Sequence, residues 1–278
     1  MRTAVSFAII AALLAAADTV LVKILAQRLH AIEIAFIRSA SGFLIVLPWL
    51  LSRQISLRSS MLPRHFVRAV IKYMAIVAFF VAVAHAPVAD VTAISLLTPL
   101  LSLTGAWIFL KEGRSWIHVA AIVLSLAGAL IIIQPGAPAF NPYLLLAIGG
   151  AIGLSSVMLL LKKLTDADLP ETILFWNLLF TAIVSAAPAL MFWTTPTPLE
   201  SLLLLFQGGL SATGILMMAH AARAGAVSQI AGLDFLRLPV AAILAFLVLG
   251  EPVNQAVWIA GPMIVVAALI LRSAARPE

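Results

Sequence analysis

The stretch of residues 142–163, PYLLLAIGGAIGLSSVMLLLKK, carries no charged side chain until it ends in Lys162 and Lys163. Its apolar part has the length of about 20 residues that an α-helix needs to cross the hydrocarbon core of a bilayer. Nine other runs are similarly long and apolar, at residues 3–26, 31–52, 67–86, 89–110, 115–134, 170–192, 201–222, 226–249 and 253–272. A membrane β-barrel would instead show alternating segments of about ten residues. The sequence therefore predicts an all-α integral membrane protein with ten transmembrane helices.

The composition excludes several classes of protein. Of the 278 residues, 63% are hydrophobic and 10% are charged, against roughly 45–50% and about 25% in soluble domains. The 17 basic residues are scattered between apolar runs, so the net charge of +6 does not indicate a nucleic-acid partner. The chain has no cysteine, no Walker A loop and no HExxH motif. We therefore expect no metal and no cofactor, and an intramembrane enzyme is the least favoured interpretation.

The basic residues predict the orientation in the membrane, because cytoplasmic connections collect Lys and Arg. With a cytoplasmic amino terminus, one side holds Arg28 alone. The other side holds twelve basic residues: Arg2, Arg53, Arg58, Arg64, Arg68, Lys111, Arg114, Lys162, Lys163, Arg223, Arg272 and Arg276. This bias predicts a bacterial inner-membrane protein with both termini in the cytoplasm.

The orientation has a direct test. Met1, Ser60 and Glu278 should be cytoplasmic, and Pro138 and Pro196 external. Since the native chain lacks cysteine, single cysteines at these positions can be labelled on intact cells with an impermeant thiol reagent. Labelling at residue 138 but not at residue 60 is expected, and labelling at residue 60 but not at residue 138 would overturn the orientation.

Several landmarks recur about half a chain apart. Glu33 and Glu171 are separated by 138 residues, and Pro48 and Pro188 by 140. The spacing predicts two five-helix halves, residues 1–136 and 137–278. Because five is odd, the second half enters the membrane from the opposite side, which is the inverted repeat typical of secondary transporters. Chance matches in a chain rich in Ala and Leu are the alternative explanation.

A proline in the fourth helix of each half precedes a glutamate at the helix end. The first copy is TPLLSLTGAWIFLKE, with Pro99 and Glu112, and the second is LPVAAILAFLVLGE, with Pro239 and Glu251. With the ten-helix pattern, this order resembles the drug/metabolite transporter superfamily, specifically its EamA-type members with two five-helix domains. The resemblance implies a secondary carrier for a small metabolite, exporting in many members and importing in some. The stretch LDFLRLPVAA, residues 233–242, resembles the branch with riboflavin and S-adenosylmethionine carriers.

Polar residues deep in the apolar runs are the candidates for substrate binding, because a charge at the bilayer centre needs a partner or a wet cavity. Asp234 and Arg237 share one helix face at i, i+3 spacing, and Pro239 frees the Phe235 carbonyl. The candidate substrate-binding residues are Asp234, Arg237, Arg38, Gln229, Trp176 and Asn177. The alternative for Asp234 and Arg237 is a structural ion pair, and the alternative for Trp176 is core packing.

Other polar residues have two interpretations each. Asp18, Asp234 and His220 are candidates for proton coupling, although Asp18 is equally a structural partner for Arg38, and His220 a helix cap. Lys72 is expected to anchor its helix at the inner surface, and Lys23 either snorkels outward or faces the cavity. Glu112 and Glu251 are expected to accept hydrogen bonds from the N–H groups that open the next helices, those at 115–134 and 253–272.

Four basic residues within the apolar runs, Lys23, Arg38, Lys72 and Arg237, outnumber the two acids Asp18 and Asp234. This excess favours an anionic or zwitterionic, amino-acid-like substrate. We therefore expect a secondary active exporter of a small polar or amphipathic metabolite, working by alternating access. The alternative is an importer of a vitamin or nucleoside-like metabolite. The expected partners are the substrate, the lipid bilayer, and protons or a counter-substrate, with the chain a monomer or homodimer.

Overall fold

The computed structural model describes residues 2–110, 116–137, 140–224 and 236–274. Across these residues the secondary structure is entirely helical and contains no strand. The helices are α1 (Arg2–Leu25), α2 (Ala31–Ser52), α3 (Leu62–His85), α4 (Val88–Ser95), α5 (Leu97–Leu110), α6 (Trp116–Ile133), α7 (Tyr143–Thr165), α8 (Pro170–Met191), α9 (Pro198–Ala224), α11 (Arg237–Leu249) and α12 (Gln255–Ala274).

Six of these helices are long and apolar enough to cross a membrane, namely α1, α2, α3, α7, α8 and α9. Four shorter apolar helical segments accompany them: Val88–Ser102, Val123–Ile133, Arg237–Leu249 and Gln255–Ala267. The all-α class is confirmed for the described residues, whereas the number of ten crossings stays a prediction.

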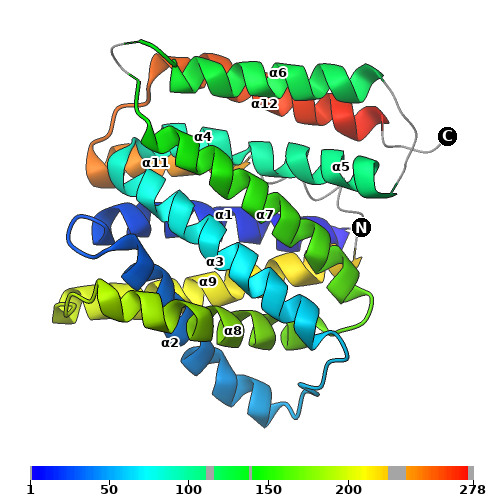
Figure 1. Cartoon of the computed structure of the whole chain (residues 1–278), viewed down its shortest axis with the longest axis vertical. Helices are drawn as coiled ribbons and strands as arrows, with labels where there is room; N and C mark the ends of the chain where they lie inside the picture. Colours follow the sequence, from blue (N-terminus) through cyan, green and yellow to red (C-terminus); the bar gives the residue numbers. More distant parts are fainter. Residues whose placement is uncertain (1, 111–115, 138–139, 225–235, 275–278) are drawn as a thin grey trace.

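Successive long helices run in opposite directions, which gives the bundle two ends. We call the end where α1 begins the near side, and the end where α1 stops the far side. The connection between α1 and α2 and that between α8 and α9 lie on the far side. The α2–α3 connection and the end of α12 lie on the near side (Figure 1).

The fourth run, residues 89–110, was expected to form one helix, and this is wrong. It is divided into α4 and α5 at Leu96. Pro99 explains the break, because proline has no N–H to donate to the Ser95 carbonyl four residues earlier. Pro99 is the third residue of α5 and Pro239 is the third residue of α11, where the missing N–H is tolerated.

Helix contacts repeat between the two halves of the chain. Helix α1 packs on α9 as α3 packs on α7, and α1 contacts α11 as α7 contacts α5. Figure 1 shows α6 and α12 side by side at one end of the long axis, with α2 and α8 toward the other. When two helices pack together, their counterparts in the other half therefore also pack together, as in a pair of halves related by a twofold axis.

Glycines allow two of these pairs to approach closely. A Cβ on Gly208 of α9 would lie 2.7 Å from the backbone nitrogen of Gly42 on α2, and a Cβ on Gly153 of α7 would lie 2.6 Å from Cβ of Ala75 on α3. Small residues at such crossings bring helix backbones together without a side chain between them. The Gly153 contact holds α3 against α7, the two helices that form much of the cavity described next.

Candidate functional site

A cavity of about 220 Å³ lies between α1, α3, α7 and α9, with contributions from α2, α5 and α11. Its apolar walls include Leu154, Met158 and Ile215. Its polar residues are Asp18, Arg38, Arg68, Lys72, Thr98, Ser211 and Arg237. The lining segments of α3, α7 and α9 belong mainly to the near-side halves of those helices. The cavity is therefore central in the bundle and displaced toward the near side.

Asp18 and Arg38 form an ion pair in the cavity wall. The Arg38 guanidinium donates to the Asp18 carboxylate at 2.9 Å and lies over the Phe80 ring, 5.6 Å from its centroid. One oxygen of Asp18 and Nε of Arg38 are buried and have no hydrogen-bond partner in the part of the chain that the structure describes. Asp18 is therefore both a structural partner of Arg38 and a residue of the cavity lining. The ion pair still has atoms that can form hydrogen bonds with a ligand.

Arg237 enters the cavity from the first turn of α11. It donates to the hydroxyl of Thr19 on α1 at 3.1 Å, and its guanidinium lies 5.4 Å from the centroid of the Phe79 ring. Its Nε is buried and has no hydrogen-bond partner among the described residues. Asp234 and Gln229, the two predicted neighbours, lie outside the described residues, so the expected Asp234–Arg237 pair stays a prediction.

Arg68 and Lys72 lie one turn apart on α3, and both line the cavity. Arg68 was counted among the basic residues of the inner side, and Lys72 was expected to anchor its helix at the inner surface. Both side chains are buried, with 4% and 8% exposed, so the expectation for Lys72 is wrong, whereas the side of the membrane assigned to Arg68 stays a prediction. Helix α3 begins at Leu62, five residues earlier than predicted. This places Arg68 in its second turn, on the face packed against α7.

Trp176 and Asn177 are adjacent in sequence, but their side chains make contacts in different parts of the structure. The Lys72 ammonium donates to the Asn177 side-chain oxygen at 2.5 Å, and the Asn177 amide nitrogen is buried with no partner in residues 2–110, 116–137, 140–224 and 236–274. Trp176 points elsewhere: its indole N–H donates to the Leu57 carbonyl at 2.9 Å and its ring stacks on Phe180. Consecutive helical residues point about 100° apart. Neither residue belongs to the cavity lining, but Asn177 contacts the lining residue Lys72, whereas Trp176 is turned toward the α2–α3 connection.

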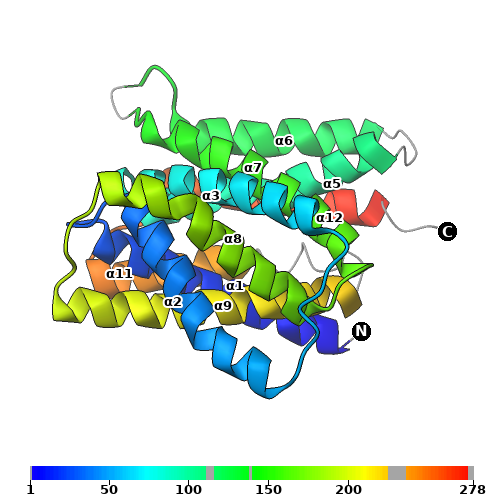
Figure 2. The same ribbon diagram turned by 60° about the horizontal axis from the view of Figure 1, so that its bottom comes forward.

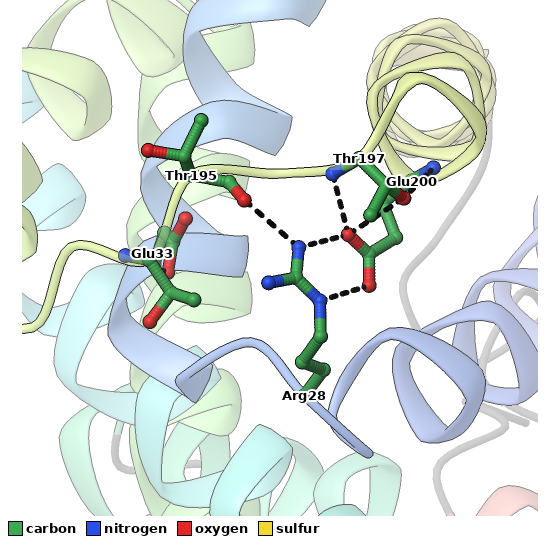
Figure 3. Close-up of polar contacts among 6 residues, drawn as sticks. Arg28, Glu33, Thr195, Thr197 and Glu200 are labelled. Atoms are coloured by element: carbon green, nitrogen blue, oxygen red, sulfur yellow. Dashed lines mark hydrogen bonds and ion pairs between the residues drawn. The ribbon is translucent and has the colours of Figure 1, made fainter.

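The far side of the bundle holds a polar junction between two connections. Figure 3 shows Arg28 between the Glu200 carboxylate and the Thr195 carbonyl, which accepts a hydrogen bond at 2.9 Å. Thr197 and Glu200 form a capping box at the start of α9, with the Thr197 N–H donating to Glu200 at 2.7 Å. The hydrogen bond from Arg28 to Glu200 raises the pKa of the Arg28 guanidinium. This junction joins the α1–α2 and α8–α9 connections.

The near side holds an equivalent junction, between the α7–α8 and α2–α3 connections. Asp168 accepts from Ser59 at 2.7 Å and contacts His65 Nε2 at 2.8 Å. Figure 2 shows the α2–α3 connection beside the start of α8, where the Ser56 carbonyl accepts from Thr172 at 2.8 Å. His220 lies on this side, 3.4 Å from Glu171 and stacked on Phe7. Sequence analysis missed His65 and Asp168, since no motif joins residues so far apart in the chain.

Two copies of one family model, the EamA-like transporter family, match residues 2–134 and 141–273. This chain belongs to that family. It is accordingly a multi-pass membrane transporter of small metabolites rather than an enzyme, as the relatives below also indicate.

The relatives of this EamA-like transporter carry different substrates. An S-adenosylmethionine uptake transporter of Rickettsia bellii is 28% identical over 84% of this chain and 81% of its own. A riboflavin transporter of Vibrio cholerae is 28% identical over 84% and 79%. The pseudopaline exporter CntI of Pseudomonas aeruginosa is 26% identical over 98% and 96%. A solved crystal structure with a TM-score of 0.71 and 19% identity covers 97% of this chain and 96% of its own, and shows the same fold.

The family motif of this transporter has a role that differs from the expected one. Glu251 was expected to cap the helix that follows it, but its carboxylate accepts from the Val88 N–H at the start of α4, at 2.9 Å, and pairs with Lys23 at 3.3 Å. Asn254 instead caps α12, accepting from the Ala256 N–H at 3.0 Å. Lys23 also donates to the Ala86 carbonyl at 2.8 Å, and its ion pair with Glu251 joins the two halves on the far side. Glu112 lies outside the described residues.

Proposed function

We propose that this EamA-like transporter is a secondary active exporter of a small, amino-acid-like metabolite that carries at least one carboxylate or phosphate group. The charge of the cavity wall carries the proposal. Asp18 neutralises Arg38, whereas Arg68, Lys72 and Arg237 have no acidic side chain within 4.0 Å among the described residues. Buried cations without partners are costly, and an anionic substrate supplies the missing partner during each transport cycle.

The size of the cavity supports a compact substrate. Pockets for drug-sized ligands measure roughly 300–1,000 Å³, and this one measures about 220 Å³. An amino-acid-sized molecule suits this space better than a riboflavin-like or nucleoside-like one, which is the alternative. Export is the direction that the family resemblance favours, and uptake is the competing direction.

Alternating access by two inverted five-helix halves, residues 1–136 and 137–278, fits this geometry. The cavity is displaced toward the near side, and the contacts of Arg28 and Lys23 close the far side above it. The repeated helix contacts support a second state of similar energy, in which the roles of the two ends are exchanged. We place the near side in the cytoplasm of a bacterial inner membrane.

The energy source that we propose is a proton gradient or exchange with a counter-substrate. Asp18, Asp234 and His220 are the candidate coupling groups. Asp18 has the strongest support, since it lines the cavity and has an unpartnered oxygen. His220 lies on α9 two residues beyond the cavity residue Met218, where its contact with Glu171 suits a group at the cavity rim.

Transport in proteoliposomes tests the function. The purified protein should exchange a small radiolabelled amino acid or organic anion across the membrane, and an imposed proton gradient should drive accumulation. Vesicles with inward-facing and outward-facing protein separate export from uptake. Exchange of organic cations alone would contradict the proposal.

The far-side junction gives a prediction about the conformational cycle. In Glu200→Gln, Arg28 loses its only acidic partner within 4.0 Å among the described residues. The state in which the cavity opens to the far side should therefore become about two to five times more populated. A cysteine replacing Ser211 in the cavity wall should then react correspondingly faster with an impermeant thiol reagent added on the far side. The exchanged pair Arg28→Glu with Glu200→Arg is the control and should restore slow labelling. Unchanged labelling in Glu200→Gln would show that this junction does not gate the cavity.

A further inference from the structure

The cations of the cavity wall form two groups at different depths. Arg38 and Arg237 lie over Phe80 and Phe79 of α3. Arg68 and Lys72 lie on α3 itself, nearer to its start. Seven residues separate Lys72 from Phe79, which is about 10 Å along a helix axis at 1.5 Å per residue. The α3 residues that support the two groups are therefore separated by about 10 Å along the helix axis, so a ligand with two acidic groups can engage both groups at once.

Each group offers donors that no described residue uses. In the deeper group these are Nε of Arg38 and Nε of Arg237. In the near-side group they are Nη1 of Arg68 and the amide nitrogen of Asn177, both on residues that are almost completely buried. Within the described part of the chain, the hydrogen bond found for the Arg68 guanidinium is a long one to the Val157 carbonyl, at 3.4 Å.

The charge of the near-side group is also unbalanced. An arginine stays protonated at any physiological pH. Asp18 is already paired with Arg38. If Asp234 pairs with Arg237, as its i, i+3 position predicts, Arg68 and Lys72 still lack an acidic partner among the residues that the structure describes.

We infer that Arg68, Lys72 and Asn177 form a second anion subsite, and that the substrate is a small organic dianion with two acidic groups about 5–10 Å apart. One acidic group binds between Arg38 and Arg237, and the other binds to Arg68, Lys72 and Asn177. The planar guanidinium and the amide supply directed N–H donors, and the ammonium supplies a compact charge. This inference rests on the proposed function and names the substrate class more narrowly.

The first experiment compares glutarate, which has two carboxylates, with pentanoate, which has one and the same chain length. Binding to the purified protein is measured by thermal shift, and inhibition by counterflow in proteoliposomes. Glutarate should bind the native protein at least tenfold more tightly than pentanoate. Glycerol 3-phosphate carries both negative charges on a single phosphate group. If binding requires two separated acidic groups and not just two charges, it should bind no better than pentanoate.

Three variants then assign the second subsite. Lys72→Met and Arg68→Gln should each weaken glutarate at least tenfold and leave pentanoate within about twofold. Asn177→Asp places a carboxylate beside Lys72 and should remove the preference for glutarate. Because the new carboxylate pairs with the buried Lys72, this variant should fold and still tests the subsite if the other two variants fold poorly. Lys163→Gln is the matched control, an exposed near-side lysine of α7, and should change neither ligand.

The outcomes separate the inference from the proposed function. Equal binding of glutarate and pentanoate by the native protein, or equal weakening of both in the variants, would overturn the second subsite and leave an anion transporter. Absence of binding and exchange for every organic anion and amino acid tested would overturn both.

Discussion

Replacing Asp18 by asparagine should lower the substrate accumulation that a proton gradient drives at least tenfold, while exchange of substrate across the membrane continues. Asp18 is the one acidic residue found in the cavity lining of the described chain, and one of its oxygens is free to accept a proton. Asparagine keeps the shape of the side chain and cannot titrate. Gradient-driven uptake and counterflow, measured in the same proteoliposomes, separate coupling from binding.

The same substitution leaves Arg38 without its acidic partner, so a loss of stability has to be distinguished from a loss of coupling. Removing one member of a buried ion pair costs about 3 kcal/mol or more. The double variant Asp18→Asn with Arg38→Gln should recover most of this thermal stability and should still fail to accumulate substrate. If the double variant, or the single one, concentrates substrate normally on a proton gradient alone, proton coupling through Asp18 is wrong.

Arg237→Lys should weaken substrate binding by about 10- to 100-fold with little change in thermal stability. Lysine keeps the charge but lacks the planar fork that binds carboxylate or phosphate through two parallel hydrogen bonds. It also loses the geometry that places the Arg237 guanidinium over Phe79 and beside Thr19. Affinity from counterflow and thermal shift from the same preparation provide the two measurements.

The control for Arg237→Lys is Arg58→Lys, the same exchange at an exposed position in the α2–α3 connection, which should bind substrate as the native protein does. The double variant Asp234→Asn with Arg237→Gln tests the structural alternative. If that double variant folds and transports at the native rate, Asp234 and Arg237 are a structural pair and the substrate site lies elsewhere in the cavity.

Much of the fold was predictable because membrane insertion depends on local composition. A run such as residues 142–163 is apolar over the length of a bilayer regardless of its neighbours, and the structure has α7 there. The break at Leu96 was not predicted, although Pro99 marks its place. A proline shows where a helix can be interrupted, whereas packing decides whether it bends, breaks or continues.

The candidate site was predictable only in part. Arg38 and Arg237 were identified because a charge in the middle of an apolar run needs a special environment, and both line the cavity. Arg68 was missed because it lies close to a helix start, where the sequence does not distinguish a buried side chain from a solvated one. Trp176 was selected for its depth, but its ring faces the α2–α3 connection.

The sequence by itself thus determined the membrane class, the family and the presence of buried charges, since each follows from composition and spacing along the chain. Only the tertiary structure decided which of those charges meet. The pairs Asp18–Arg38 and Lys72–Asn177, and the junctions at Arg28 and Asp168, join residues on different helices or connections. Their proximity depends on the direction in which each helix face is turned, and that direction is set by packing against the other half of the bundle.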